Sequence, residues 1–202
     1  MRRLLAFLAV TADGYHESPD QEFDWHNAPE TEDSGYPTAS GFRDLDDPQA
    51  DEADTLLFGR VTYELMAAYW PTPAAKEAEP RIAARMNDLP KLVASRTLRR
   101  AEWANSRLLS GDVAAEVAAL KRQPGKDIMI LGSSTLTGFL LEHGLVDELR
   151  LLVNPIVLGA GRSVLAGVRG RVPLVLTRST TFGPGNFLLR YEAASSSRGA
   201  AS

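Results

Sequence analysis

The sequence contains no cysteine among its 202 residues. A disulfide framework, a catalytic thiolate and a zinc site built on thiolates are therefore excluded. The net charge is −4, and the sequence shows no basic stripe of the kind found in a general nucleic-acid binder. We expect a protein whose partner is a small molecule, with no nucleic acid and no metal.

Long hydrophobic runs are also missing. No run approaches the roughly 18 apolar residues of a membrane span. The apolar segment Leu4–Val10 is short and no small-residue cleavage site follows it, so we interpret it as a first β-strand rather than a signal peptide. We expect a cytoplasmic protein that does not associate with membranes. Residues 1–193 are expected to form a single domain, and the Ala/Ser-rich residues 194–202 a disordered tail.

The usual phosphate-binding motifs are absent. There is no G-x-G-x-x-G near the first predicted strand, and Gly125-Lys126 lacks the upstream glycine and the following Ser or Thr of a P-loop. A dinucleotide-binding protein with this sequence would therefore not have a standard Rossmann fold.

Predicted strands alternate with predicted helices over the first three-quarters of the chain. The strands are expected at 2–10, 55–58, 91–95, 108–109 and 127–131, and the helices from Arg60 onward and over 75–87, 113–122 and 135–143. From Glu148 the strands follow one another closely, at 149–153, 156–158, 173–182 and 187–192. This order predicts an α/β fold with a mixed, mostly parallel central sheet, flanking helices and C-terminal antiparallel strands.

A long polar loop is expected between Thr11 and Pro37, and loops of this length are often functional lids. It contains His16 and His26 beside several acidic residues, but their spacing fits no standard metal site. We therefore interpret these histidines as part of an exposed polar lid. The third histidine, His143, is expected to interact with the end of a helix before Gly144.

Three predicted strands end in residues that suit an anion. The segments that follow them are 59–62 (Gly-Arg-Val-Thr), 95–97 (Ser-Arg-Thr) and 132–135 (Gly-Ser-Ser-Thr). Ligands of open α/β sheets bind beyond the carboxyl ends of the strands, and helix N-termini favour phosphate. Two arginines suit the 2′-phosphate that distinguishes NADPH from NADH. The alternative for the first segment is an ordinary strand-turn-helix in which Arg60 makes a salt bridge.

These segments resemble the dihydrofolate reductase-like superfamily, and most closely the reductase domain of the bifunctional riboflavin-biosynthesis deaminase-reductase. The resemblance covers roughly residues 2–192 with the order of motifs intact. The matching segments are Thr11–Gly14, Gly59–Glu64, Ser95–Leu98, Ile130–Leu136, Val146–Leu149 and Pro155–Gly161. The deaminase half is not found, because the chain has no H-x-E with P-C-x-x-C.

The resemblance implies a hydride-transferring reductase that uses NADPH. Ser95 and Arg96 would surround the 2′-phosphate, and the segment that begins at Gly132 would hold the pyrophosphate. The Gly132-Ser133 bond lies where the family has a cis Gly-Gly peptide. The resemblance also implies dimers formed through the late strands, so we expect a homodimer. The cofactor-binding residues that it implies are Gly59, Arg60, Thr62, Ser95, Arg96, Leu131, Gly132, Ser133, Ser134 and Thr135.

The substrate side is predicted from fewer residues. We interpret Asp13 as the catalytic group that hydrogen-bonds substrate or water, with Gly14 beside it, although Asp13 could instead stabilise its own turn. Trp25 could stack on a planar heterocycle or simply pack within the loop. Arg162 could contact a substrate phosphate or belong to a tight strand connection. Glu30 follows a W-x-x-P-like stretch and is an alternative acid.

Three functions are compatible with this pattern. The first is an NADPH-dependent reductase of a nitrogen heterocycle, resembling the 5-amino-6-(5-phosphoribosylamino)uracil reductase of riboflavin biosynthesis. The second is a dihydrofolate reductase, for which the carboxylate is displaced. The third is a nucleotide-binding module that binds NADPH without turnover.

Overall fold

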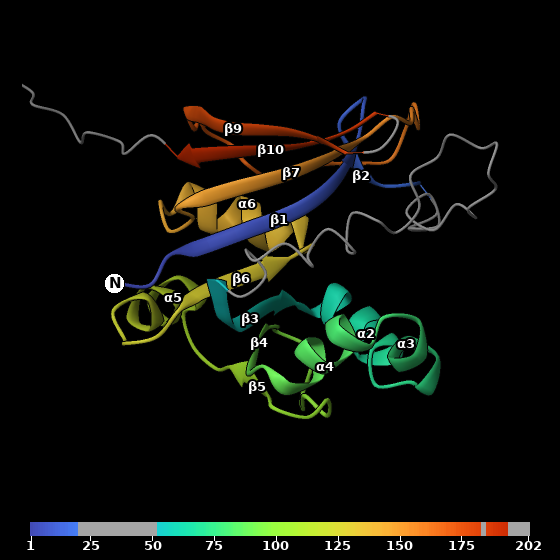
Figure 1. Cartoon of the computed structure of the whole chain (residues 1–202). Coiled ribbons are helices and arrows are strands. Elements are labelled where there is room, and N and C mark those ends of the chain that lie inside the picture. Colours follow the sequence, from blue (N-terminus) through green and yellow to red (C-terminus); the bar gives the residue numbers. More distant parts are fainter. Residues whose placement is uncertain (20–51, 183–184, 194–202) are drawn as a thin grey trace, which may run out of the picture.

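The computed structural model describes residues 1–19, 52–182 and 185–193, which build one eight-stranded sheet with helices on both faces (Figure 1). The strands are β1 (Leu4–Thr11), β2 (Tyr15–Glu17), β3 (Ala53–Gly59), β4 (Lys91–Ala94), β5 (Ser106–Leu109), β6 (Asp127–Leu131), β7 (Glu148–Asn154), β8 (Arg162–Ser163), β9 (Leu174–Phe182) and β10 (Asn186–Ala193). The helices are α2 (Arg60–Tyr69), α3 (Pro73–Ala78), α4 (Pro80–Asp88), α5 (Val113–Lys121) and α6 (Ser134–Glu142).

The sheet has the order β5-β4-β3-β6-β1-β7-β10-β9. The strands from β5 to β7 are parallel, whereas β10 runs antiparallel to both β7 and β9. The predicted fold class is therefore confirmed. All the parallel strands end at the same edge of the sheet, which brings the ends of β3 and β6 side by side.

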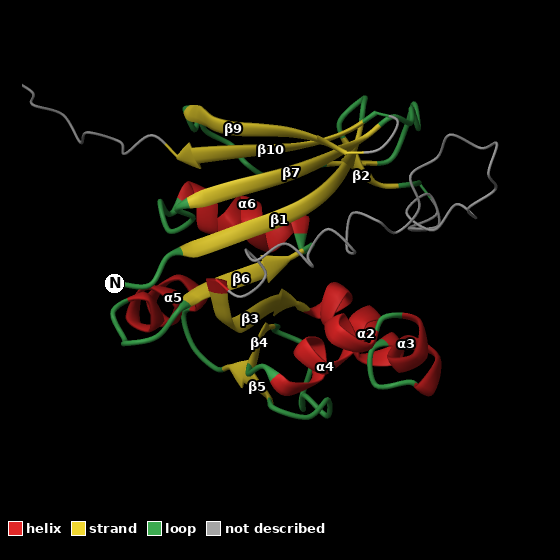
Figure 2. Cartoon of the chain, in the orientation of Figure 1, coloured by secondary structure: helices red, strands yellow, loops and turns green. Residues whose placement is uncertain are grey.

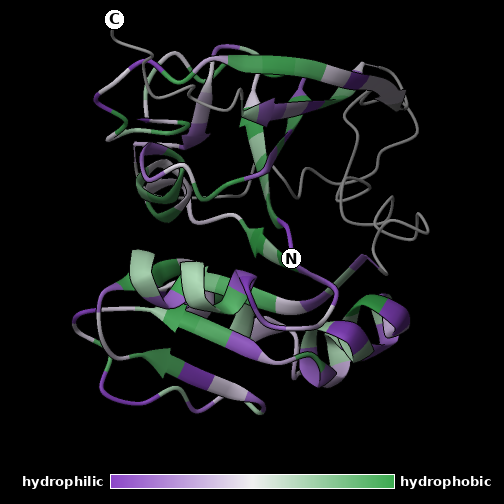
Figure 3. Ribbon diagram, turned by 90° about the vertical axis from the view of Figure 1, so that its left-hand side faces the viewer, coloured by the Kyte–Doolittle hydropathy of each residue, from purple (hydrophilic) through white to green (hydrophobic). Residues whose placement is uncertain are grey.

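Two apolar cores cover the two faces of the sheet. Helices α5 and α6 pack on one face, and α2, α3 and α4 pack on the other (Figure 2). Every residue of β1 is buried, which explains why this strand is a continuous apolar run instead of an alternating one. Figure 3 shows that hydrophobic residues concentrate in the central strands. Among the described residues, no helix has both the length and the apolar character needed to cross a membrane.

Two predicted elements are wrong. The single helix expected over 75–87 is divided into α3 and α4, because Pro80 has no N–H to continue the first helix and Glu79 before it leaves the helical region (φ −139°, ψ 66°). The strand expected over 156–158 is an irregular turn. Pro155 cannot donate to a sheet ladder, and the N–H of Ile156 donates to the carbonyl of Asn154 at 2.8 Å.

Three further points concern the predicted loops. The short strand β2 lies within the segment expected to be a loop, and it pairs with β8. The Gly132-Ser133 peptide is trans, because the described residues contain no cis bond, and both residues have positive φ. Trp25, Glu30 and the tail 194–202 lie outside the described residues.

Candidate functional site

The turns after β3 and β6 are hydrogen-bonded to each other. The backbone N–H of Gly59 donates to Oγ of Ser133 at 2.9 Å, and the N–H of Ser133 donates to Oγ1 of Thr62 at 3.1 Å. Gly132 must be small here, because a Cβ on it would lie 3.1 Å from Cγ2 of Thr62 and its φ is +62°. These two hydrogen bonds hold the start of α2 against the start of α6.

Neither of these two helices has a side-chain cap. The N-cap residue of α2 is Gly59, and the hydroxyl of Ser133, the N-cap of α6, accepts from Gly59 instead of from its own helix. By contrast, Thr72 caps α3, and Asp112 caps α5. The first-turn N–H groups of α2 and α6 therefore lack a side-chain acceptor in the described part of the chain. Such N–H groups, together with the helix dipole, form a binding site for an anion.

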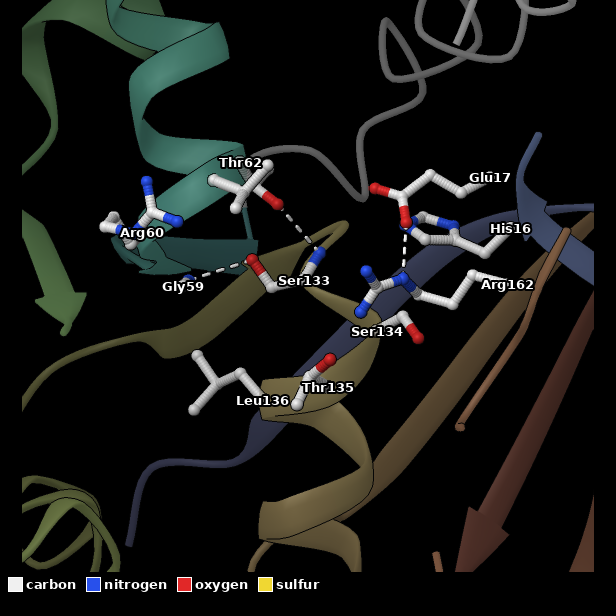
Figure 4. A pocket seen from close by; sticks show the side chains of 11 residues that line it. His16, Glu17, Gly59, Arg60, Thr62, Ser133, Ser134, Thr135, Leu136 and Arg162 are labelled. Atoms are coloured by element: carbon white, nitrogen blue, oxygen red, sulfur yellow. Dashed lines mark hydrogen bonds and ion pairs between the residues drawn. The ribbon is translucent and has the colours of Figure 1, made fainter. Parts of the chain in front are cut away.

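A hollow of about 150 Å³ opens where these helices begin (Figure 4). We call it the strand-end hollow. One side is formed by the start of α2, the middle by the start of α6, and the opposite side by β2 and β8. Its lining residues are His16, Glu17, Gly59, Arg60, Val61, Thr62, Ser133, Ser134, Thr135, Leu136 and Arg162.

The β2–β8 side of the hollow carries an ion pair. Nε of Arg162 lies 2.5 Å from Oε2 of Glu17, whose side chain is buried, while the Arg162 side chain is half exposed. Gly161 allows this contact, because a Cβ on it would lie 2.1 Å from the carbonyl oxygen of Glu17. Arg162 therefore belongs both to a tight strand connection and to the hollow, so the two alternatives predicted for it are compatible.

His16 is also buried on this side of the hollow. Its Nδ1 lies 2.9 Å from the carbonyl oxygen of Ala9 in β1. Burial lowers the pKa of His16, as does the charge of Arg162, whereas the hydrogen bond to Ala9 and the charge of Glu17 raise it. The interpretation of His16 as part of an exposed lid is wrong; His26 lies outside the described residues.

Residues 2–188 match the RibD C-terminal domain. The chain belongs to this family. One relative is the uncharacterized protein YyaP of Bacillus subtilis (strain 168), which is 33% identical over 185 residues, or 91% of each chain. The predicted resemblance to the riboflavin-biosynthesis reductase branch is thereby confirmed.

Solved structures show the same fold. A Shewanella sp. PV-4 protein ascribed to riboflavin biosynthesis has a TM-score of 0.70 at 17% identity, with 95% of this chain and 99% of that chain covered. A diaminohydroxyphosphoribosylaminopyrimidine deaminase/5-amino-6-(5-phosphoribosylamino)uracil reductase from Thermotoga maritima has a TM-score of 0.64 at 14% identity. The match covers 96% of this chain and 57% of that chain. A dihydrofolate reductase from Enterococcus faecalis, complexed with NADP(H), has a TM-score of 0.56 at 16% identity, with 95% and 96% covered.

Most of the predicted cofactor residues of this RibD C-terminal domain meet in the strand-end hollow. Arg60 lines it and also pairs with Glu64 at 2.6 Å, one helical turn along α2. Both of these side chains are exposed, and an exposed pair of this kind contributes only about 0.3–0.5 kcal/mol. The salt bridge predicted as an alternative for Arg60 is therefore present, but it is weak enough to yield to a phosphate. Leu131 ends β6 inside the core and does not line the hollow.

Ser95 and Arg96 lie outside this lining. They follow β4, which is the neighbour of β3, so they stand at the same edge of the sheet. Oγ of Ser95 accepts the N–H groups of Thr97 and Leu98 at 3.2 and 2.9 Å, which fixes the turn. The side chain of Arg96 is exposed. The structure thus brings together two of the three predicted segments and places the third beyond them.

Asp13 also lies outside the lining, in the turn after β1. Its Oδ1 accepts the hydroxyl of Thr11 at 2.6 Å and the N–H of Leu158 at 3.3 Å, and its Oδ2 accepts the N–H of Gly159 at 2.7 Å. The bond from Thr11 and the backbone bonds lower the pKa of Asp13, against desolvation, which raises it. Next to it, the carbonyl of Gly14 accepts the N–H of Val164 at 2.9 Å. These contacts favour the turn-stabilising alternative, and the catalytic role of Asp13 stays a prediction.

Sequence reasoning missed the buried side of the hollow. His16 and Glu17 belong to a strand of three residues whose partner, β8, has only two. No periodic pattern identifies strands this short. The one local signal is Gly161 next to Arg162, because a glycine before a charged residue is compatible with a close backbone approach.

Proposed function

We propose that this RibD C-terminal domain is an NADPH-dependent reductase of a nitrogen-heterocyclic small molecule. The observation that carries the proposal is the pair of uncapped helix N-termini, α2 and α6, which open into one hollow beside Arg60. A phosphorylated dinucleotide would satisfy the N–H groups that no side chain of the described residues caps.

The residues present fit this cofactor. The start of α6, with Ser133, Ser134 and Thr135, offers N–H groups and hydroxyls to the pyrophosphate, and the hydroxyl of Ser134 is buried without a hydrogen-bond partner in the described residues. Arg60, Ser95 and Arg96 lie at the strand edge where the 2′-phosphate would be held. Bound NADPH would supply a hydride to the substrate. The protein would orient the two reactants and exclude water.

The substrate class rests on the family. The Thermotoga maritima structure is described as a 5-amino-6-(5-phosphoribosylamino)uracil reductase, and we propose a related heterocycle here. Arg162, half exposed in the hollow, is proposed to bind an anionic group of the substrate. Asp13, Gly14 and Trp25 are proposed as further substrate residues.

We also propose a homodimer formed through the late strands. Strand β9 is at the edge of the sheet, and Val175 and Leu176 on it are exposed. Sedimentation equilibrium tests this point, and a monomer at all concentrations would contradict it.

The cofactor proposal is tested with Arg60→Ala combined with Arg96→Ala. Each charge-assisted hydrogen bond contributes about 1.5–3 kcal/mol, so each arginine should account for about a tenfold or greater loss of NADPH affinity. NADH lacks the 2′-phosphate, and its affinity should change little. Arg122→Ala combined with Arg171→Ala is the matched control, because both arginines are exposed and neither lines the hollow. Equal losses for both cofactors would contradict the assignment.

Turnover is tested separately by following NADPH oxidation with two probes, 5-amino-6-(5-phosphoribosylamino)uracil and dihydrofolate. Oxidation with the first supports the proposed reductase, and oxidation with dihydrofolate alone supports a dihydrofolate reductase. Tight NADPH binding without turnover of either would favour the non-catalytic module.

A further inference from the structure

Reduction of a C=N bond requires a proton as well as a hydride. The carbon receives the hydride, and the nitrogen must receive a proton from a nearby acid or from water. If the proposed function holds, an acid in or beside the strand-end hollow is expected to supply it. In the described turn after β1 and in β2, the side chains that can carry a titratable proton are Asp13, Tyr15, His16 and Glu17, and of these only His16 and Glu17 line the hollow.

Asp13 is poorly suited to donate a proton. Its carboxylate accepts three hydrogen bonds, two of them from backbone N–H groups that can only donate. These bonds lower its pKa, so the group remains ionised at neutral pH. It also lies outside the lining of the hollow. Asp13 can therefore accept a hydrogen bond from a substrate, but it holds no proton to give.

Glu17 lines the hollow, but its carboxylate is already engaged. Oε2 lies 2.5 Å from Nε of Arg162. An ion pair with a guanidinium uses the charged form of the carboxylate, which carries no proton.

His16 has the required position and a defined tautomer. A carbonyl oxygen can only accept, so the 2.9 Å contact with Ala9 places a proton on Nδ1 and leaves Nε2 as the nitrogen that gains and loses a proton. The side chain is 6% exposed, yet it lines the hollow opposite the starts of α2 and α6 (Figure 4). An imidazole held in this way is oriented by the protein rather than by solvent.

We propose that His16 is the catalytic acid of the reductase and that its Nε2 delivers a proton to the substrate nitrogen during reduction. This proposal rests on the proposed function. The C=N bond gains the hydride on carbon and the His16 proton on nitrogen and becomes CH–NH, while the cofactor is oxidised. The neutral imidazole then regains a proton from water, which restores the starting state.

The surroundings of His16 define the expected pH dependence. Among the described residues, the charged groups that act on it are Glu17 in its own strand and Arg162 in β8; Glu17 favours the imidazolium, whereas Arg162 and burial oppose it. Its pKa is therefore below the ordinary value of about 6.5. Because the donor must be protonated, kcat should fall as the pH rises above that pKa, by about tenfold per pH unit.

The test is His16→Gln, with His143→Gln as the matched control. His143 also contacts a carbonyl through Nδ1, at 2.8 Å from Phe139, but it is exposed at the end of α6 and does not line the hollow. The NADPH affinity and the pH profile of kcat with 5-amino-6-(5-phosphoribosylamino)uracil are measured for each. In His16→Gln we expect kcat to fall about 100-fold and its pH dependence to flatten, with NADPH affinity changed by less than about threefold. His143→Gln should match the wild type.

The outcomes separate the two proposals. An unchanged pH profile in a His16→Gln protein that still turns over would overturn the role of His16 and leave the reductase intact. A wild-type protein that binds NADPH but reduces neither probe would overturn the reductase, and the role of His16 with it. Nitrogen NMR of the wild-type imidazoles gives a readout independent of activity and of the stability of the variant. A neutral His16 with its proton on Nε2, or one that does not titrate, would also overturn the proposal.

Discussion

The backbone N–H of Gly59 donates to the hydroxyl of Ser133 at 2.9 Å, across 74 positions of the sequence. Both residues are the N-caps of helices that open into the strand-end hollow. The hydroxyl of Ser133 is therefore used to join two helix starts instead of capping one. Within the described residues, this leaves the N–H groups of the first turn of α6 without a side-chain acceptor, and such groups suit an anionic ligand.

Replacement of Ser133 tests this relationship. Ser133→Ala should lower the free energy of unfolding by about 1–3 kcal/mol, because the N–H of Gly59 loses its acceptor. NADPH affinity should fall as well, since the relative position of α2 and α6 is no longer fixed. Ser110→Ala, at an exposed position, is the control. Urea denaturation and NADPH titration measure both effects, and a stable variant with unchanged affinity would contradict the role of this bond.

A substitution of Asp13 can distinguish a role in the reaction from a role in positioning the 155–162 turn. Asp13→Asn keeps one acceptor oxygen, but its NH2 group must face either the N–H of Leu158, which now donates to Oδ1, or the N–H of Gly159, which now donates to Oδ2. We expect lower turnover with NADPH affinity unchanged. A fall in kcat at constant KM would support a role in the reaction, whereas a rise in KM with a loss of stability would support positioning of the 155–162 turn. Unchanged turnover would remove Asp13 from the mechanism.

The central strands could be predicted because their environment is simple. β1, β3 and β6 are buried on both faces and therefore appear in the sequence as short apolar runs bounded by polar or glycine residues. The cap of α5 by Asp112 is likewise a local signal. The prediction of a strand over 156–158 was wrong because these residues also form a short apolar run. The preceding Pro155 directs the backbone into a turn instead.

The candidate site could be predicted in full only on one side, and on the other the sequence indicated Arg162 alone among the lining residues. The starts of α2 and α6 carry their proposed ligand-binding groups within four or five consecutive residues, so the local composition indicates them. The opposite side depends on the pairing of Tyr15 and Glu17 with residues 162–163. That pairing is specified by the 155–162 turn and by contacts such as Asp13 with Gly159, which no local pattern indicates.

Gly161 should be the most sensitive glycine of that turn. In Gly161→Ala the new Cβ would meet the carbonyl oxygen of Glu17 at 2.1 Å, at a φ of +141° that side chains disfavour. The 155–162 turn must then move, and with it the pairing of Arg162 with Glu17. We expect a loss of stability of about 1–3 kcal/mol and lower turnover, with NADPH affinity largely kept.

Gly159→Ala is the matched control for Gly161. Gly159 also has a positive φ, of +72°, but a Cβ there would meet no atom of the described residues within 4 Å. Its cost should be limited to backbone strain of about 1–2 kcal/mol, and turnover should be nearly normal. Thermal unfolding and steady-state kinetics separate the two variants. Equal effects on turnover would show that the close approach at Gly161 does not position Arg162.

The contribution of Lys91 to the stability of the folded protein is expected to depend on pH. Its side chain is fully buried at the start of β4, where Nζ donates to the carbonyls of Asn87 and Leu89 at 2.9 and 2.7 Å and lies 4.5 Å from the ring centre of Trp103. Burial lowers the pKa of Lys91 from 10.5 to about 8. Between these two values the unfolded chain binds a proton that the folded protein does not, so the stability contributed by this residue rises with pH.

Comparison with Lys91→Met isolates this contribution, because both proteins share all other titrating groups. The difference in unfolding free energy, wild type minus variant, should grow in favour of the wild type as the pH rises from about 8, by up to about 3 kcal/mol. Lys76→Met, at an exposed position of α3, should show a difference that does not depend on pH. Urea denaturation across this alkaline range measures both. A constant difference for Lys91→Met would mean that the folded protein keeps this ammonium charged, with the hydrogen bonds to Asn87 and Leu89 compensating its burial in full.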